Sequence, residues 1–405
     1  MSYTPPQKVL ENYADVLVNF ALNGGEGLKK GEVVYVMGQE VTKPLYTEVC
    51  KAVWRSGGHV IDGFFPNEAG RYGELNDMYD VASDEQLDFF PTKFYKGLSD
   101  AIDHQLMILS DTDLHALEKV DPQKILRRRK ARHPFMQWRD EKENAGKFTW
   151  TLGLYGTEAA AKEALMTEEE YWEQIINACF LNEADPVARW RETEAKIKEY
   201  VAKLDNLPIE KLHVEGKDVD LWIKLGEKRR WMGGSGRNVP SFEVFTSPDW
   251  RGTEGWIRFN QPLYSYGSMI ENIRLEFKDG KVVKATADTN EPVLKQMIAT
   301  EHADKVGEFS MTDQRLSRIT KFMANTLYDE NIGGPFGNTH IAVGKSYQDC
   351  YDGDPAPVSK EEWERLGFND SSVHTDMITT ADRTVTATLT DGSEKVIYKN
   401  GQFRL

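Results

Sequence analysis

The segment Gly337-Asn338-Thr339-His340-Ile341-Ala342-Val343-Gly344 is a short apolar run that carries one histidine. A second run, Ser372-Val373-His374-Thr375-Asp376-Met377-Ile378, carries another histidine with an aspartate two residues later. Both runs predict β-strands. Because alternate residues of a strand point to the same face, the second strand would present an imidazole and a carboxylate side by side. Such a pair of donors is typical of a site for a divalent metal ion.

Three glutamates earlier in the chain are candidates for the remaining ligands. Glu243 and Glu308 lie between apolar neighbours in predicted strands, and Glu330 precedes a glycine-rich turn. Each of them taken alone could simply face solvent. An unpaired carboxylate is costly to bury, however, and a shared cation would compensate several at once. Five or six carboxylate and imidazole donors suit two divalent ions that share a bridging carboxylate.

Tyr347 follows His340 by seven residues and could supply a phenol to the same site. The alternative interpretation is a tyrosine that merely ends a strand.

The segments with these residues belong to a half of the chain, 207–405, that reads mainly as short antiparallel strands. Favoured hairpin dipeptides occur at Asp279-Gly280, Asp391-Gly392 and Asn400-Gly401. Helical spacing is limited to about 291–303, 312–328 and 359–366. We therefore expect an α+β domain that carries the metal site.

The first half, 1–206, has a different pattern. Four apolar runs alternate with helical segments, which predicts a mainly parallel sheet flanked by helices; the runs are 32–38, 59–64, 105–110 and 148–153. Neither a Gly-x-Gly-x-x-Gly motif nor a Walker-type loop follows the first run, so a nucleotide site is not expected.

Composition narrows the class of protein further. A length of 405 residues favours two domains. The formal net charge of −15 disfavours nucleic acid as a partner, and the basic run 127–132 is better explained as a solvated helix face. Apolar runs fall short of the roughly 20 residues that span a bilayer. The three cysteines are scattered and the N-terminus has no secretory pattern, so we expect a reduced, cytoplasmic protein without a membrane partner.

These residues together resemble a known family, the thermophilic-type metalloaminopeptidases of the aminopeptidase T, aminopeptidase S and leucyl aminopeptidase group. The resemblance covers nearly the whole chain, and its motifs occur in the family's order. They are Asn238-Val239-Pro240 with Glu243-Val244-Phe245-Thr246 and Pro248, then Gly307-Glu308, Tyr328-Asp329-Glu330-Asn331, His340-Ile341-Ala342-Val343-Gly344, Tyr347, and His374 with Asp376-Met377.

The resemblance implies a two-domain homodimer that removes N-terminal residues from peptides. It implies two divalent ions per chain, such as zinc, cobalt, magnesium or manganese. Carried over residue by residue, the metal ligands would be Glu243, Glu308, Glu330, His340, His374 and Asp376. Tyr347 would be an active-site tyrosine.

Two segments depart from the family's pattern. Nine residues, 331–339, separate Glu330 from His340, where many members have a shorter connection, and this makes the placement of Glu330 an open question. The segment 249–255 has no clear counterpart and bears on the shape of the substrate pocket.

The expected chemistry is metal-assisted peptide hydrolysis, in which Glu308 or Glu243 accepts a proton from water and Tyr347 stabilises an oxyanion. Two alternatives remain. The same fold resembles a mononuclear non-haem iron dioxygenase that opens dihydroxypyridine rings, for which His340, His374 and Asp376 could form the iron site. The other is a non-catalytic peptide-binding module with a structural metal.

Overall fold

The computed structural model describes residues 3–67, 74–117, 119–265 and 268–405. The chain divides into two compact units. Unit 1 comprises Met1–Arg191 and Ser235–Val239, and unit 2 comprises Glu192–Gly234 and Pro240–Leu405. A domain boundary near residue 206 stays a prediction about where the two domains separate.

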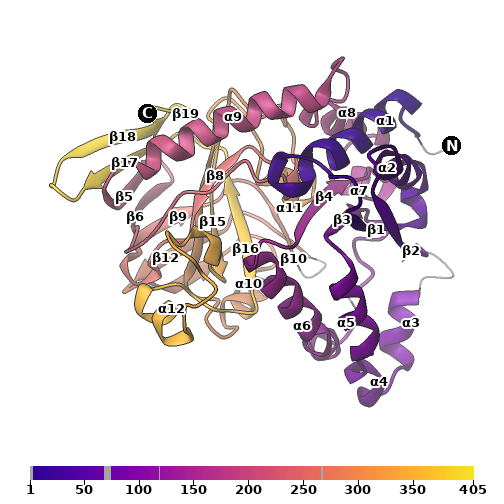
Figure 1. Ribbon diagram of the computed structural model, residues 1–405. Coiled ribbons are helices and arrows are strands. Elements are labelled where there is room, and N and C mark those ends of the chain that lie inside the picture. The colour runs from indigo at the N-terminus through magenta and orange to yellow at the C-terminus, as the bar shows by residue number, and fades with distance from the viewer. Residues whose placement is uncertain (1–2, 68–73, 118, 266–267) are drawn as a thin grey trace. The chain divides into compact units, whose positions relative to one another are not determined.

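Unit 1 is built on a five-stranded sheet in the order β2-β1-β3-β4-β7 (Figure 1). All of its strand pairs are parallel. The predicted parallel sheet is therefore confirmed. Its strands are β1 (Val33–Gln39), β2 (His59–Phe65), β3 (His104–Leu109), β4 (Thr149–Leu154) and β7 (Asn238–Val239).

Helices occupy the connections between these strands, as a parallel sheet requires. Several begin at side-chain caps; Thr167 and Glu170, for example, form a capping box at the start of α8. The helices are α1 (Gln7–Val16), α2 (Lys43–Arg55), α3 (Glu74–Val81), α4 (Asp84–Asp88), α5 (Thr92–Ala101), α6 (Pro122–Asn144), α7 (Glu158–Glu163), α8 (Glu168–Ala178) and α9 (Pro186–Asp205), which continues into unit 2. In the part of the chain that the structure describes, we find no helix with the length and apolar character needed to cross a bilayer.

The strands of unit 2 pair in antiparallel fashion, as predicted, and among the described residues they form two main sheets and one two-stranded hairpin. The larger has eight strands in the order β13-β12-β9-β6-β5-β17-β18-β19, and the smaller has the order β16-β15-β14-β8. The larger sheet comprises β5 (Ile209–Gly216), β6 (Val219–Lys224), β9 (Glu254–Arg258), β12 (Arg274–Lys278), β13 (Lys281–Thr286), β17 (Arg383–Leu389), β18 (Glu394–Lys399) and β19 (Gln402–Phe403); β10 (Leu263–Ser265) and β11 (Ser268–Ile270) form a separate hairpin.

The smaller sheet divides its side chains between two faces. Its strands are β8 (Glu243–Thr246), β14 (Val306–Thr312), β15 (Asn338–Gly344) and β16 (His374–Thr379). Residues such as Val244, Met311 and Ile341 join the main core, to which the larger sheet also contributes. Since side chains alternate along a strand, their neighbours Glu243 and His340 point to the opposite face. One side of this sheet is therefore core, and the other carries the candidate donors.

A β-bulge places Glu308 on the donor-bearing face. The pairing of β14 with β15 shifts register between Val306 and Glu308, so that Gly307 is an extra residue. Val306 and Phe309 both reach the core because of this shift. A Cβ atom at Gly307 would lie only 2.2 Å from the Lys345 carbonyl oxygen, so glycine is required at this close approach.

Most of the turns and short helices of unit 2 follow the sequence; the loop at Asp391-Gly392 is longer than the two residues expected, because Leu389 pairs with Ser393. The dipeptides Asp279-Gly280 and Asn400-Gly401 form hairpin turns in which both residues have positive φ. Helices α10 (Glu291–Ile298), α11 (Thr326–Asp329) and α12 (Lys360–Leu366) are present.

The helix predicted over 312–328 is wrong, because 313–325 has no helical structure and only α11 forms at its end. Two buried aspartates organise this segment instead. Asp313 accepts hydrogen bonds from the Arg315 and Phe403 amides, and Asp329 accepts them from the Met323 and Asn325 amides. These local side-chain bonds to the backbone compete with helix formation.

Arg383 connects the two sheets of unit 2 and offers a test of this fold. Its side chain is 1% exposed, pairs with Asp218 at 3.0 Å, and donates to the Arg258 carbonyl and the Thr339 hydroxyl. We expect Arg383→Met to destabilise the protein by about 3 kcal/mol, because Asp218 would lose its partner in a largely buried setting. Denaturant unfolding measures this. Arg365→Met, which breaks an exposed pair with Glu362, should leave the denaturation midpoint nearly unchanged. Equal losses of stability in the two variants would contradict a stabilising role of the buried Arg383 pair.

Candidate metal centre

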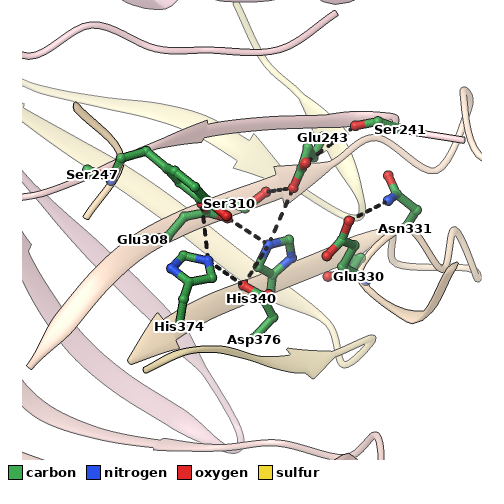
Figure 2. A network of polar contacts seen from close by, with 12 residues as sticks. Ser241, Glu243, Ser247, Glu308, Ser310, Glu330, Asn331, His340, His374 and Asp376 are labelled. Carbon is green, nitrogen blue, oxygen red and sulfur yellow. Dashed lines mark hydrogen bonds and ion pairs between the residues drawn. The ribbon is translucent and has the colours of Figure 1, made fainter. Parts of the chain in front are cut away.

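The donor-bearing face of the smaller sheet brings five of the predicted residues together (Figure 2). His340 Nε2 lies 3.2 Å from Glu308 Oε1 and 3.5 Å from Glu243 Oε2. His374 Nε2 lies 3.6 Å from Asp376 Oδ1 and 3.9 Å from Glu308 Oε2. Four adjacent strands thus converge on one cluster of imidazole and carboxylate groups.

The cluster consists of two groups of donor atoms. Glu243, Glu308 and His340 form one, and Glu308, His374 and Asp376 form the other; within each group the donor atoms lie within 4.8 Å of one another. Glu308 belongs to both, with Oε1 towards His340 and Oε2 towards His374. Several separations of 3.5–3.9 Å exceed a hydrogen bond. Such a donor set fits a borderline divalent ion.

Neighbouring polar groups fix the orientation of the donors. His374 Nδ1 lies 2.8 Å from the Lys345 carbonyl oxygen. A proton on Nδ1 would satisfy that carbonyl and leave the Nε2 lone pair for the cluster, as in many metal-binding histidines. Glu243 accepts hydrogen bonds of 3.3 Å from the hydroxyls of Ser310 and Ser241. These contacts hold both side chains in place.

Burial and neighbouring charges shift the pKa values of the ionisable groups in the cluster. Burial, with the nearby Glu308, raises the pKa of Glu243 to about 7. Burial also raises the pKa of Glu308. For His374, burial opposes the charged form, but Asp376 and Glu308 raise its pKa to about 9. The electrostatics therefore favour added positive charge, whether supplied by protons or by metal ions.

Tyr347 lies at the edge of the cluster. Its ring is tilted against the His374 ring with 4.6 Å between centroids, and its side chain is 37% exposed. Its amide donates to the Ser247 hydroxyl. Loss of hydration and the carboxylates of Glu308 and Asp376 raise its pKa well above the ordinary value. The phenol therefore stays protonated and able to donate a hydrogen bond.

Glu330 is the sixth predicted ligand and is placed differently. It ends α11, is 6% exposed, and belongs to neither donor group among the described residues. Its Oε1 lies 3.4 Å from Asn331 Nδ2, the contact that Figure 2 draws for it. A role for Glu330 as a ligand stays a prediction.

The sequence reasoning missed a supporting residue, Asn331. It is fully buried, and its Oδ1 accepts a 2.6 Å hydrogen bond from the Phe242 amide. One side chain therefore ties the residue before Glu243 to the residue after Glu330. The available signal was its place in the motif Tyr328-Asp329-Glu330-Asn331, directly after a candidate glutamate.

Two small residues on the same face were missed as well. Ser310 lies opposite His340, and Ala342 lies between Glu308 and Asp376. Their small side chains leave room above the sheet among the larger donors. Period-two alternation from Glu308 and His340 would have identified both.

Comparisons with known proteins find matches that cover almost the full length of the chain. The thermophilic metalloprotease (M29) family matches residues 6–403. Aminopeptidase T of Thermus thermophilus is 28% identical, over 97% of this chain and 98% of that protein. The structure of wild-type AmpT from Thermus thermophilus superposes with a TM-score of 0.83 at 26% identity, covering 98% of this chain and 100% of that chain.

A more distant structure shares the fold. The 2,5-dihydroxypyridine dioxygenase of Pseudomonas putida KT2440 has a TM-score of 0.50 at 14% identity, over 98% of this chain and 96% of that one. This likeness concerns the fold alone. The match of residues 6–403 shows that the chain belongs to the thermophilic metalloprotease (M29) family.

Proposed function

We propose that this metalloaminopeptidase holds two divalent ions, and that Glu308 would contribute a carboxylate oxygen to each of them. The observation that carries the proposal is the sharing of Glu308 between two donor groups. Glu243 and His340 would complete one ion's ligands, and His374 and Asp376 the other's. Zinc, cobalt, magnesium and manganese all accept such donors.

The reaction we propose is hydrolysis of the first peptide bond of a substrate with a free N-terminus. Bound divalent ions would supply Lewis acidity and lower the pKa of a coordinated water. The protein's own groups would then act on protons. Glu243, whose Oε1 is turned towards the Ser241 hydroxyl, would accept the proton of the attacking water; Glu308 would take this role only in place of bridging the two ions.

Tyr347 would stabilise the negative charge that develops on the carbonyl oxygen. Its ring rests on His374 at the open edge of the cluster. The raised pKa keeps the phenol protonated, so it can donate a hydrogen bond to an oxyanion.

The ring-cleaving dioxygenase alternative receives less support from the site. A mononuclear iron centre needs His340, His374 and Asp376, and leaves Glu243 and Glu308 unexplained. These carboxylates are 8% and 4% exposed, and burying them without a cation would be costly. A non-catalytic binding module is disfavoured because the chain's relatives over nearly full length are aminopeptidases.

We also propose peptides as partners, a homodimeric assembly and a cytoplasmic location. The sequence has three cysteines, scattered and without a pairing pattern, which supports a reducing compartment. The formal net charge of −15 disfavours a nucleic-acid partner.

Removal of metal should abolish activity. We expect a chelator to stop hydrolysis of aminoacyl-p-nitroanilides and added zinc or cobalt to restore it, with about two equivalents of metal per chain by elemental analysis. His374→Ala should retain fewer equivalents. One equivalent of ferrous iron, together with oxygen consumption, would instead indicate the dioxygenase.

Glu308→Gln should greatly reduce the stabilisation of the folded state by bound metal. In the wild type, metal at about 1,000 times its Kd should stabilise the folded state by roughly 4 kcal/mol per site, which appears as a higher thermal midpoint. The variant loses the shared carboxylate and should gain far less. Glu210→Gln, at an exposed position of β5, should respond like the wild type. An undiminished metal response in Glu308→Gln would contradict a bridging role.

Tyr347→Phe should lower kcat by about 100-fold with little change in metal content, because it removes one oxyanion donor and keeps the ring on His374. Steady-state kinetics on a leucine p-nitroanilide measures this. Tyr95→Phe in unit 1 is the matched control and should be as active as the wild type. Unchanged kcat in Tyr347→Phe would exclude the phenol from catalysis.

A further inference from the structure

We propose that two residues outside the donor cluster, Ser247 and Asn369, position Tyr347 and His374 for the reaction. Both act through residues 344–347, which are called the anchored segment below. The inference rests on the proposed aminopeptidase function and adds two positioning residues to it. Neither Ser247 nor Asn369 is a candidate metal ligand.

The anchored segment supports two functional side chains at once. It begins at Gly344, the last residue of β15, which also carries His340. The Lys345 carbonyl oxygen lies 2.8 Å from His374 Nδ1. Tyr347 ends the segment, and its ring centroid lies 4.6 Å from that of His374. A shift of this short stretch of backbone would therefore move the phenol and release the imidazole together.

Asn369 holds the first part of the segment. Its side chain is buried, at 4% exposure, and its Nδ2 donates to the Gly344 carbonyl at 2.6 Å and to the His302 carbonyl at 2.8 Å. Its amide donates to the Ser346 hydroxyl, and its carbonyl accepts from the Ser346 amide. One asparagine thus fixes the residues on both sides of Lys345, whose carbonyl orients His374.

Ser247 holds the other end of the segment. It directly follows β8 and is fully buried, and its hydroxyl accepts a 2.8 Å hydrogen bond from the Tyr347 amide. Its carbonyl accepts from Arg229 Nε, and the same guanidinium donates to the Leu366 carbonyl. Ser247 is therefore itself fixed in place and offers Tyr347 a stationary acceptor.

The Tyr347 side chain has little other polar support. Among the residues that the structure describes, its hydroxyl has no hydrogen-bond partner, and its ring contacts those of His374 and Phe245. Ring contacts of this kind resist displacement only weakly, and the side chain is 37% exposed. The backbone anchor at Ser247 therefore sets where the phenol lies. A hydrogen bond to an oxyanion weakens steeply when its geometry is lost.

The first experiment is a double-mutant cycle on the metal-loaded full chain. Ser247→Ala removes the acceptor of the Tyr347 amide, and we expect kcat for leucine p-nitroanilide to fall about 10-fold with KM and metal content nearly unchanged. In a Tyr347→Phe background the same substitution should lower kcat by less than about twofold, because the phenol that Ser247 positions is already gone. A general loss of packing would lower kcat equally in both backgrounds.

The second experiment measures metal affinity and needs no turnover. Asn369→Ala removes both side-chain donors, and we expect the Kd for zinc, measured by calorimetric titration of the metal-free protein, to rise about 10- to 100-fold, as when an outer-shell partner of a ligand is lost. In a His374→Ala background the further rise should be less than about twofold. If Asn369→Ala does not fold, Asn369→Ser, which keeps one donor, takes its place.

Two buried residues of unit 1 are matched controls. Asn12 is also 4% exposed, and its Nδ2 donates to the Leu181 carbonyl; Ser99 is 2% exposed in α5. Asn12→Ala and Ser99→Ala should lower the thermal midpoint at most as far as the test variants do, and should keep the wild-type kcat and zinc Kd.

The outcomes separate the positioning roles from the proposed function. Losses that disappear in the Tyr347→Phe and His374→Ala backgrounds support both. A loss of kcat in Ser247→Ala that is equal in both backgrounds, or a zinc Kd in Asn369→Ala equal to that of Asn12→Ala, overturns the positioning roles and leaves the aminopeptidase in place. Absence of hydrolysis by the metal-loaded wild type overturns both.

Discussion

Carboxylates that share one buried face are the constraint on which unit 2 depends. Glu243, Glu308 and Asp376 are each no more than 9% exposed and lie around two imidazoles. Negative charges removed from water repel one another strongly. A sheet can hold them only if cations or protons compensate the charge and if the rest of the unit supplies stability. The site therefore destabilises the fold, and the hydrophobic core must offset that free-energy cost.

One face of the smaller sheet supplies the stabilising core contacts, and the other face carries the donors. Core residues such as Val244, Met311 and Ile341 alternate with the donors and join the core to which the larger sheet contributes. Arg383 adds a polar link between the sheets. Because each donor's immediate chain neighbour is anchored in that core, the donors are held on rigid strands, which suits a site that must keep several ligands in register.

Much of this arrangement could be predicted from the sequence. Glu243, Glu308, His340, His374 and Asp376 could be identified as candidate ligands because each is an isolated polar residue in an apolar run. Period-two alternation and the cost of burying charge can both be inferred from a single sequence. Features set by tertiary contacts could not be read. The register shift at Gly307 occurs where the Lys345 carbonyl approaches the backbone closely, a contact between residues distant in sequence. The irregular path of 313–325 depends on buried Asp313 and Asp329, whose partners lie up to 90 residues away.

The bulge at Gly307 has a consequence for anyone who would transplant this centre. Copying the donor side chains onto a regular antiparallel sheet would fail, since without the extra residue Val306 and Glu308 would share a face. Either the valine would leave the core or the glutamate would enter it. The minimal portable unit is thus a set of side chains together with one backbone irregularity. A design library that varies residue identities on a fixed, ideal backbone would not contain it.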